Sequence, residues 1–137
     1  MKVHPLVTET LSTRQRSQII DITRLVERAV AAAGIQNGIV VVFVPHTTAG
    51  VTINENADPD VKHDLLRKLE ELVPQREQFY LHGEGNSDSH AKTALVGNSS
   101  TIIVEGARLV LGTWQGVYFC EFDGPRQRQL LIRVMGE

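Results

Sequence analysis

The sequence predicts an α+β fold: a mainly antiparallel β-sheet or sandwich of about eight strands with two helices packed on it. Three observations carry this prediction: two segments with helical apolar spacing, one continuous β-branched run, and a C-terminal third of short apolar segments separated by glycines. No linker, repeat or low-complexity tract divides the 137 residues, which suffice for one hydrophobic core. We therefore expect a single domain covering residues 1–137.

Both helices are indicated by an apolar stripe and by signals at their ends. From Thr23 onward, apolar residues recur at helical spacing as far as Gly34, so Thr23 is the expected cap and Gly34 the terminator. Asp58 and Pro59 form a cap followed by proline at the first helical position. The stripe behind them continues to Leu72, which predicts a second helix.

The strands are expected in the remaining apolar segments. Residues 3–11 alternate loosely, and residues 17–23 fit either a strand or the entry to the first helix. The run 38–44 has the character of a strand buried on both faces, and 51–53 is a short strand. The segments at 101–105, 107–111, 116–123 and 127–134 are closely spaced, which favours antiparallel pairing.

Composition narrows the classes of partner. Fourteen basic against sixteen acidic residues leave a formal net charge of -2, so no overall basic field favours nucleic acid, and we expect no nucleic-acid partner. The longest apolar stretch, 38–45, is far shorter than the roughly 20 residues that cross a bilayer, so we expect no membrane partner. The lone Cys120 and the lack of any secretory signal predict a cytoplasmic protein.

The segment 81–90 has almost no apolar content and contains two imidazoles, two carboxylates and an amide, and we interpret it as a functional loop. Together with His46, its His82 and His90 supply three imidazoles, a set that suits zinc or another divalent transition metal. A fourth ligand could come from Glu55, Asp88 or Cys120. The alternative is that these are loop residues making ordinary turn hydrogen bonds.

Further candidates lie at the ends of the expected strands. Glu55 follows a strand without an obvious structural task, which makes it a candidate base or ligand. Trp114 is either packed in the core at a hairpin or an aromatic platform for a heterocycle, with Gln115 reading a ring nitrogen. Arg126 and Arg128 could clamp a phosphate, with Lys92 in the same subsite, although solvated arginines are equally common at strand edges.

Five motifs then stand in a recognisable order: 46–49 (HTTA), 54–61 (NENADPDV), 84–85 (EG), 89–92 (SHAK) and 112–116 (GTWQG). The chain resembles the YjbQ-like family, also called the secondary thiamine-phosphate synthase family. This resemblance implies a compact α+β domain, assembly as a homotrimer, and low thiamine-phosphate synthase activity, although many members are uncharacterised. The positions that match the family motifs are His46, Asn54, Glu55, Asp58, His90, Lys92, Trp114, Gln115 and Arg126.

Three hypotheses follow for the function. The first is a synthase acting on a small phosphorylated heterocycle, with His46, Glu55 and His90 as catalytic residues and substrate held by Asn54, Lys92, Trp114, Gln115, Arg126 and Arg128. A divalent metal, zinc or magnesium, would neutralise the departing pyrophosphate. The second is a metal-dependent hydrolase that activates water at His46, His82 and His90. The third is a non-catalytic protein that binds a metal or a small ligand.

Overall fold

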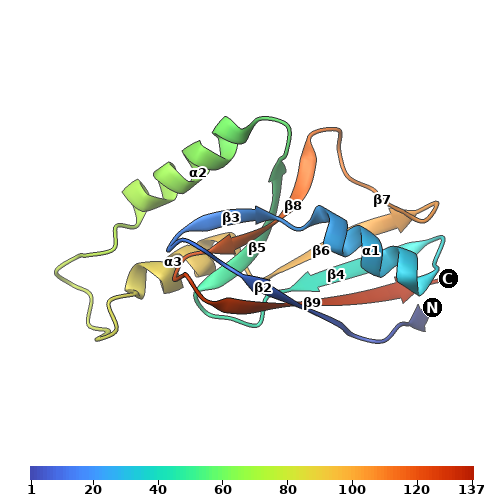
Figure 1. The fold of residues 1–137 in the computed structure, drawn as a ribbon, viewed down its shortest axis with the longest axis horizontal. Helices are drawn as coiled ribbons and strands as arrows, with labels where there is room; N and C mark the ends of the chain where they lie inside the picture. Colours follow the sequence, from blue (N-terminus) through green and yellow to red (C-terminus); the bar gives the residue numbers. More distant parts are fainter.

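The computed structural model describes all residues, 1–137, as two antiparallel sheets and three helices. The six-stranded sheet has the order β1-β9-β4-β6-β7, with β2 also paired to β9, and the three-stranded sheet has the order β3-β8-β5 (Figure 1). The strands are β1 (Lys2–Val3), β2 (Val7–Ser12), β3 (Gln18–Asp21), β4 (Gly38–Phe43), β5 (Ala49–Glu55), β6 (Ser99–Glu105), β7 (Arg108–Leu109), β8 (Gln115–Glu121) and β9 (Gln127–Gly136). The predicted α+β class and antiparallel pairing are confirmed.

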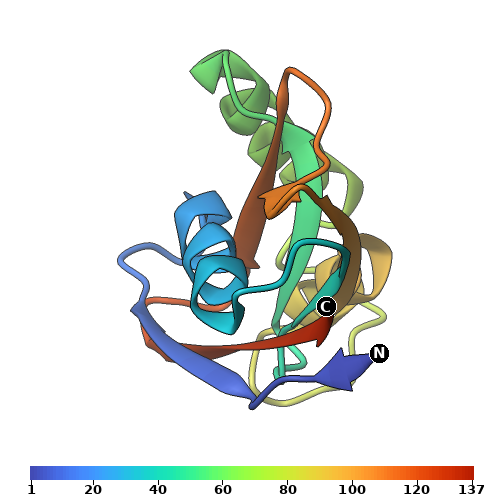
Figure 2. The same ribbon diagram turned by 90° about the vertical axis from the view of Figure 1, so that its right-hand side faces the viewer.

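Helix α1 (Thr23–Ala33) lies on the inner side of the large sheet and closes the space between the two sheets (Figure 2). Its buried residues Val26, Ala29 and Val30 belong to one hydrophobic core with residues of β4, β5, β6, β8 and β9. The predicted terminator is confirmed, because Gly34 has a left-handed φ of 69°. Thr23 is the first helical residue rather than the cap, and its backbone N–H donates to Asp21.

Strand β4 is buried on one face only, which corrects the expectation that both faces are covered. Val40 and Val42 are fully buried, whereas Phe43 is 43% exposed, and Ile103, which pairs with Ile39 of β4, is 61% exposed. No helix covers the outer face of the large sheet (Figure 2). This face therefore presents apolar side chains to its surroundings.

Helix α2 (Pro59–Leu72) begins as predicted, with the Asp58 side chain accepting the backbone N–H of Asp60 and proline in the first turn. It packs against β3 at the end of the molecule away from α1 (Figure 1). The chain then continues through an irregular segment into α3, which packs against β5. None of the three helices combines the length and apolar character needed to span a membrane.

The third helix, α3 (Ser87–Val96), was not predicted, and residues 87–90 of the presumed functional loop form its first turn. Its buried side is polar: Asp88, Ser89, Lys92 and Thr93 are the buried residues. A search for apolar residues at helical spacing cannot find such a helix. The interpretation of 81–90 as one surface loop is therefore wrong for its second half.

Candidate functional site

A polar pocket of about 530 Å³ lies where β4 ends and the chain turns towards β5, beside the start of β9. Asn98 holds this turn in place, since its amide donates to the carbonyls of Val44 and His46. The pocket thus lies where β4 of the large sheet ends and β9 begins, beside the turn that leads to β5. Its lining residues are Phe43, Val44, Pro45, His46, Thr47, Thr48, Asn98, Arg126 and Arg128.

His46 lines this pocket and continues the hydrogen bonding of the large sheet. The β4–β9 ladder ends at the pair Phe43–Leu131, and the next free β9 amide, Gln129 N–H, donates to His46 Nε2 at 2.9 Å. Because Nε2 accepts, the proton of the neutral ring is placed on Nδ1. His46 therefore has one fixed nitrogen and one N–H left as a donor.

Burial lowers the pKa of His46 below its usual 6.5, and the nearby positive charge of Arg128 lowers it further. We expect NMR titration of the His46 ring to give a lower midpoint in the native protein than in the urea-unfolded chain. The folded state then binds fewer protons, so this residue's contribution to stability is complete above pH 6.5 and is lost as the pH falls through the lower folded pKa. A native midpoint at or above the unfolded one would contradict this geometry.

Arg128 forms the buried wall of the pocket. It is only 3% exposed and forms an ion pair with Glu121, which is 0% exposed, while Nη2 also donates to Thr48. Burial alone would raise the pKa of Glu121, but hydrogen bonds from Arg128, the Asp123 amide and Thr13 lower it overall. The remaining Arg128 nitrogen, Nη1, makes no hydrogen bond within the chain. This atom keeps some exposed surface, so it remains available at the surface of the pocket.

Arg126 precedes β9 and is the more accessible of the two arginines, with 50% of its side chain exposed. Its Nε donates to the carbonyl of Asp123 and its Nη2 to the Asp123 carboxylate, both at 3.0 Å. Exposed pairs of this kind contribute little stability, so the guanidinium can exchange its partner at small cost. Arg126 and Arg128 thus line the same pocket, as predicted. Each is already paired with a carboxylate, Arg126 with Asp123 and Arg128 with Glu121.

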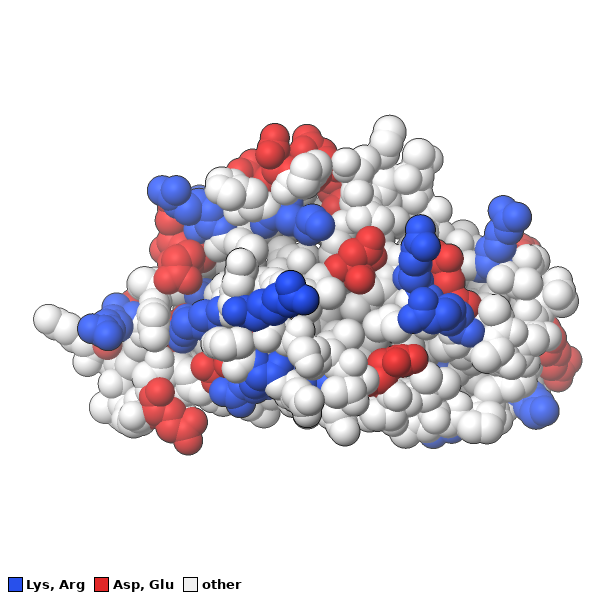
Figure 3. Space-filling view, viewed as in Figure 1, with Lys and Arg blue, Asp and Glu red and all other residues white.

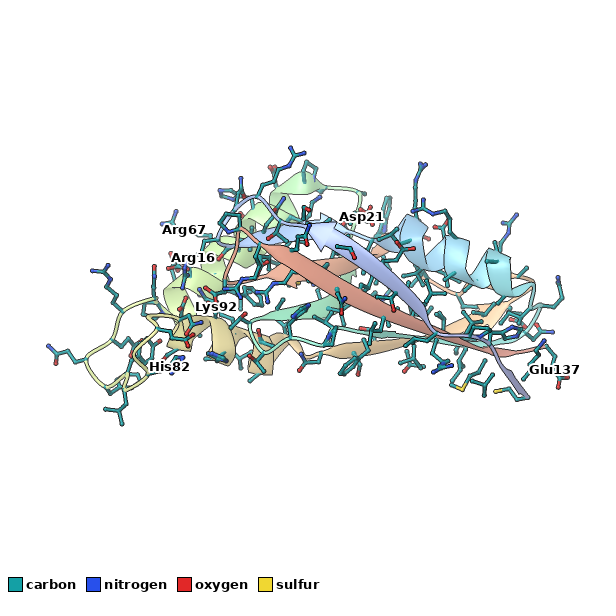
Figure 4. All side chains as sticks on the ribbon, turned by 60° about the horizontal axis from the view of Figure 1, so that its bottom comes forward. Arg16, Asp21, Arg67, His82, Lys92 and Glu137 are labelled. Carbon is teal, nitrogen blue, oxygen red and sulfur yellow. The ribbon has the colours of Figure 1, made fainter.

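Lys92 does not reach the pocket. It is 1% exposed and donates to Asp88 at 3.0 Å and to Glu70 of α2 at 2.8 Å. Arg16 adds a bidentate pair to the same Asp88 carboxylate, and Figure 4 shows the Arg16 and Lys92 side chains close together beside α2. Lys92 is held in a buried ion cluster that joins α2, α3 and the N-terminal segment, where no phosphate has access to it.

His82 and His90 lie next to each other, with ring centroids 5.4 Å apart in an edge-to-face arrangement. His82 is on the segment between α2 and α3 (Figure 4), and its Nε2 is 3.6 Å from Glu84. His46 is in the separate pocket described above, and within the chain no three His, Cys, Asp or Glu side chains meet in a geometry that holds a metal ion. The three predicted ligands thus do not fit a zinc or magnesium site in one chain.

Cys120, considered above as a fourth ligand, is buried in β8, and desolvation raises its pKa to about 12. We expect no reaction of the native protein with 5,5′-dithiobis(2-nitrobenzoate) at pH 8. The unfolded chain in urea should release about one thiolate equivalent, because only one cysteine is present. Rapid labelling without urea would contradict the buried position.

The other predicted residues lie at the far end of β5 and β8. Glu55 pairs with Gln115 there, six residues along the ladder from the pair Ala49–Glu121, which at about 3.3 Å per residue is roughly 20 Å. Within one chain, Asn54, Glu55, Trp114 and Gln115 therefore do not join the His46 pocket. Their proposed roles need a second chain or a separate site.

Two of these residues have local tasks. The Glu55 carboxylate accepts the Ala57 N–H at 2.7 Å, which corrects the view that Glu55 has no structural role. Gln115 Oε1 accepts the Gly112 N–H and fixes the turn. Trp114 is 63% exposed, so it is not a core residue, and its role as an aromatic platform stays a prediction.

Sequence reasoning missed Glu121, Asp88's partner Arg16, and Asn98. Glu121 carried a signal, because it is the single carboxylate in the apolar run of β8 and a buried carboxylate requires a partner. Asp88 and Lys92 stand four residues apart, which predicts an ion pair once a helix is recognised. Asn98 carried no signal, since its role depends on three-dimensional contact with the 44–49 turn.

Two packed antiparallel sheets, three helices and a polar His–Arg pocket at one end define a small single-domain α+β protein. The model of the family described as "UPF0047 protein YjbQ-like" matches residues 8–137. The chain belongs to this family.

Relatives and solved structures agree with this assignment. The UPF0047 protein YugU of Bacillus subtilis is 53% identical over 131 residues, covering 96% of this chain and 99% of the relative. A crystal structure of a YjbQ/UPF0047 protein from Clostridium acetobutylicum is 51% identical with a TM-score of 0.92, covering 94% and 99% of the two chains. One from Sulfolobus solfataricus, described as of unknown function, is 32% identical with a TM-score of 0.94, covering 99% of both.

Proposed function

We propose that the pocket around His46 binds a small phosphorylated heterocycle, and that the reaction is of the thiamine-phosphate synthase type. The observation that carries this proposal is the set of donors on residues that line one cavity: His46 Nδ1–H and Arg128 Nη1, which have no partner in the chain, and the half-exposed Arg126, which is held only by Asp123. Phosphate oxygens accept hydrogen bonds from such groups, and arginine matches their geometry.

The charges around the pocket determine how an anion would be held. Arg128 is neutralised by Glu121 and Arg126 by Asp123, so the pocket has donors without a large net positive charge. Arg128 is fixed by its buried pair and supplies a preorganised N–H, whereas Arg126 can move from Asp123 to the ligand. Binding then depends on hydrogen-bond geometry more than on long-range attraction.

In this proposal a pyrimidine pyrophosphate joins a thiazole phosphate with loss of pyrophosphate. The arginines and the Thr47 and Thr48 segment hold phosphate oxygens, and His46 donates from Nδ1 to an oxygen on which charge develops. His90 and Glu55 remain proposed proton carriers, and Trp114 remains a proposed ring platform, on a neighbouring chain. Lys92 does not contribute to the proposed substrate site, because it is buried and paired with Asp88 and Glu70.

We also propose assembly as a homotrimer, which would bring such a second chain to the pocket. The outer face of the large sheet has no helix on it and exposes Phe43 and Ile103. The segment before α3 exposes Phe79 by 71% and Leu81 by 97%, a high exposure for apolar residues. Sedimentation equilibrium should give about three times the chain mass of 15.2 kDa, whereas a monomer at micromolar concentration would contradict the proposal.

A growth test distinguishes synthase activity from simple binding. A strain that lacks its own thiamine-phosphate synthase should grow without thiamine when it expresses this protein, but not the His46→Ala or Arg126→Ala variant. Arg67→Ala is the matched control, because Arg67 is an exposed arginine whose only ion pair is with Glu71 on α2. Failure of the wild-type protein to support growth, or equal growth with all variants, would contradict the proposal.

A second candidate function, metal-dependent hydrolysis, rests on the contact between His82 and His90. Two adjacent imidazoles could bind a divalent metal if a further ligand came from another chain. Elemental analysis of the purified protein tests this candidate: about one zinc per chain, lost in His90→Ala but retained in His63→Ala, would favour it. Metal-free protein with intact activity would exclude it.

A further inference from the structure

A second, larger hollow of about 960 Å³ lies between α1 and the chain from β7 to β8. It shares no lining residue with the His46 pocket. Its apolar floor includes Val30, Leu109 and Leu111. The volume is in the range of sites that hold nucleotide-sized ligands.

Three arginines line this hollow: Arg24 and Arg28 from α1, and Arg108 from β7. All three are exposed, and none forms an ion pair or a side-chain hydrogen bond within the chain. Arg24 and Arg28 are four residues apart on one helix, where like charges destabilise each other. Figure 3 shows basic side chains over α1, with acidic side chains beside them.

The local charge differs in sign from that of the whole chain. Glu27 is the only acidic residue in the lining, so three arginines against one glutamate give a formal charge of +2, whereas the chain carries -2. The other cationic residues of interest are neutralised: Arg128 by Glu121, Arg126 by Asp123, and Lys92 by Asp88 and Glu70. Three arginines without a partner in the chain therefore line one hollow.

The polar groups in the lining leave donors rather than acceptors available. Gln115 Oε1 accepts the Gly112 N–H, so the Gln115 amide has its NH₂ group free. Asn56 Oδ1 accepts the Tyr118 hydroxyl, and Thr23 Oγ1 both donates to Asp21 and accepts from Val117 N–H. Apart from Glu27, the groups without partners are therefore N–H donors.

We propose that this hollow is a second ligand site, which takes a phosphomonoester with a flat or apolar body of nucleotide size. The phosphate is held between Arg28 and Arg108, and the body lies on the floor formed by Val30, Leu109 and Leu111. The site is independent of the function proposed for the His46 pocket. A small ester is favoured over nucleic acid because the chain as a whole is acidic.

Isothermal titration calorimetry with adenosine 5′-monophosphate tests the proposal. We expect saturable binding that adenosine does not reproduce. Arg28→Gln combined with Arg108→Gln should raise Kd by about tenfold or more, because charge-assisted hydrogen bonds are lost. Far-UV circular dichroism of the variant establishes that it is folded.

Arg126→Gln is the matched control, since it alters an exposed arginine of the other pocket. A change in Kd of less than about twofold in this variant, with the large effect in the double variant, supports a separate site. Weakening by Arg126→Gln alone would place the nucleotide in the His46 pocket and overturn the proposal. Absence of saturation at millimolar concentration, or equal binding of adenosine, would overturn it as well.

Discussion

Replacing Glu121 by glutamine is expected to lower the free energy of unfolding by about 3–5 kcal/mol, because it leaves the Arg128 charge buried without its counter-ion. Glu121 is 0% exposed and accepts from Arg128 and Thr13 and from two backbone amides. Glutamine keeps the size of the side chain but loses the negative charge. Urea unfolding followed by circular dichroism measures the change in the free energy of unfolding.

Two further variants establish the cause of this loss. Glu71→Gln removes the partner of Arg67 on the surface of α2 and should cost less than about 1 kcal/mol. Glu121→Leu combined with Arg128→Met removes both charges and should recover much of the stability lost in Glu121→Gln. A loss in Glu121→Gln no larger than in Glu71→Gln would show that the buried pair does not carry the effect.

Replacing Asp88 by asparagine is also expected to lower the free energy of unfolding by about 3–5 kcal/mol. Lys92 then keeps only Glu70 as an ion-pair partner, and Arg16 loses its carboxylate partner. Asp88 is 0% exposed and connects α3 with the N-terminal segment. Asp64→Asn on the exposed face of α2 is the matched control and should change stability by less than about 1 kcal/mol. Equal effects of the two substitutions would contradict the central role of Asp88.

The pH dependence provides an independent check on Asp88. Burial alone would raise the pKa of Asp88, but hydrogen bonds and charges from Arg16 and Lys92 lower it below the usual 3.8. The unfolded state then binds more protons, so the contribution is complete above pH 3.8 and is lost as the pH falls through the lower folded pKa. We expect the stability difference between wild type and Asp88→Asn to narrow below pH 3.8.

The elements that could be predicted from the sequence are those whose buried side is apolar. Helix α1 follows from its apolar stripe and Gly34, and α2 from Asp58 and Pro59. Helix α3 could not be predicted in this way, because its buried side includes Asp88 and Lys92, which form an ion pair in the interior. Its polar sequence was therefore taken for an exposed loop.

Some residues of the candidate site could likewise be predicted from the sequence, whereas others could not. His46, Arg126 and Arg128 could be singled out because they follow or begin strands, and the structure brings them to one pocket. Their partners Glu121 and Asn98 act through contacts between distant segments, which spacing alone does not reveal. Glu55 and Trp114 stand in matching motifs but lie at the other end of β5 and β8, since a seven-residue strand separates the motifs in space.

The central claim, that the His46 pocket binds a phosphorylated heterocycle, is tested most directly by amide NMR during titration with a thiazole phosphate. The Gln129 N–H reports on the pocket because it donates to His46 Nε2, and any ligand bonded to Nδ1 alters that hydrogen bond. We predict saturable shifts centred on Gln129, Thr47 and Asn98 that are absent in Arg126→Gln. Saturable binding with these three amides unchanged, or no binding at millimolar ligand, would contradict the claim.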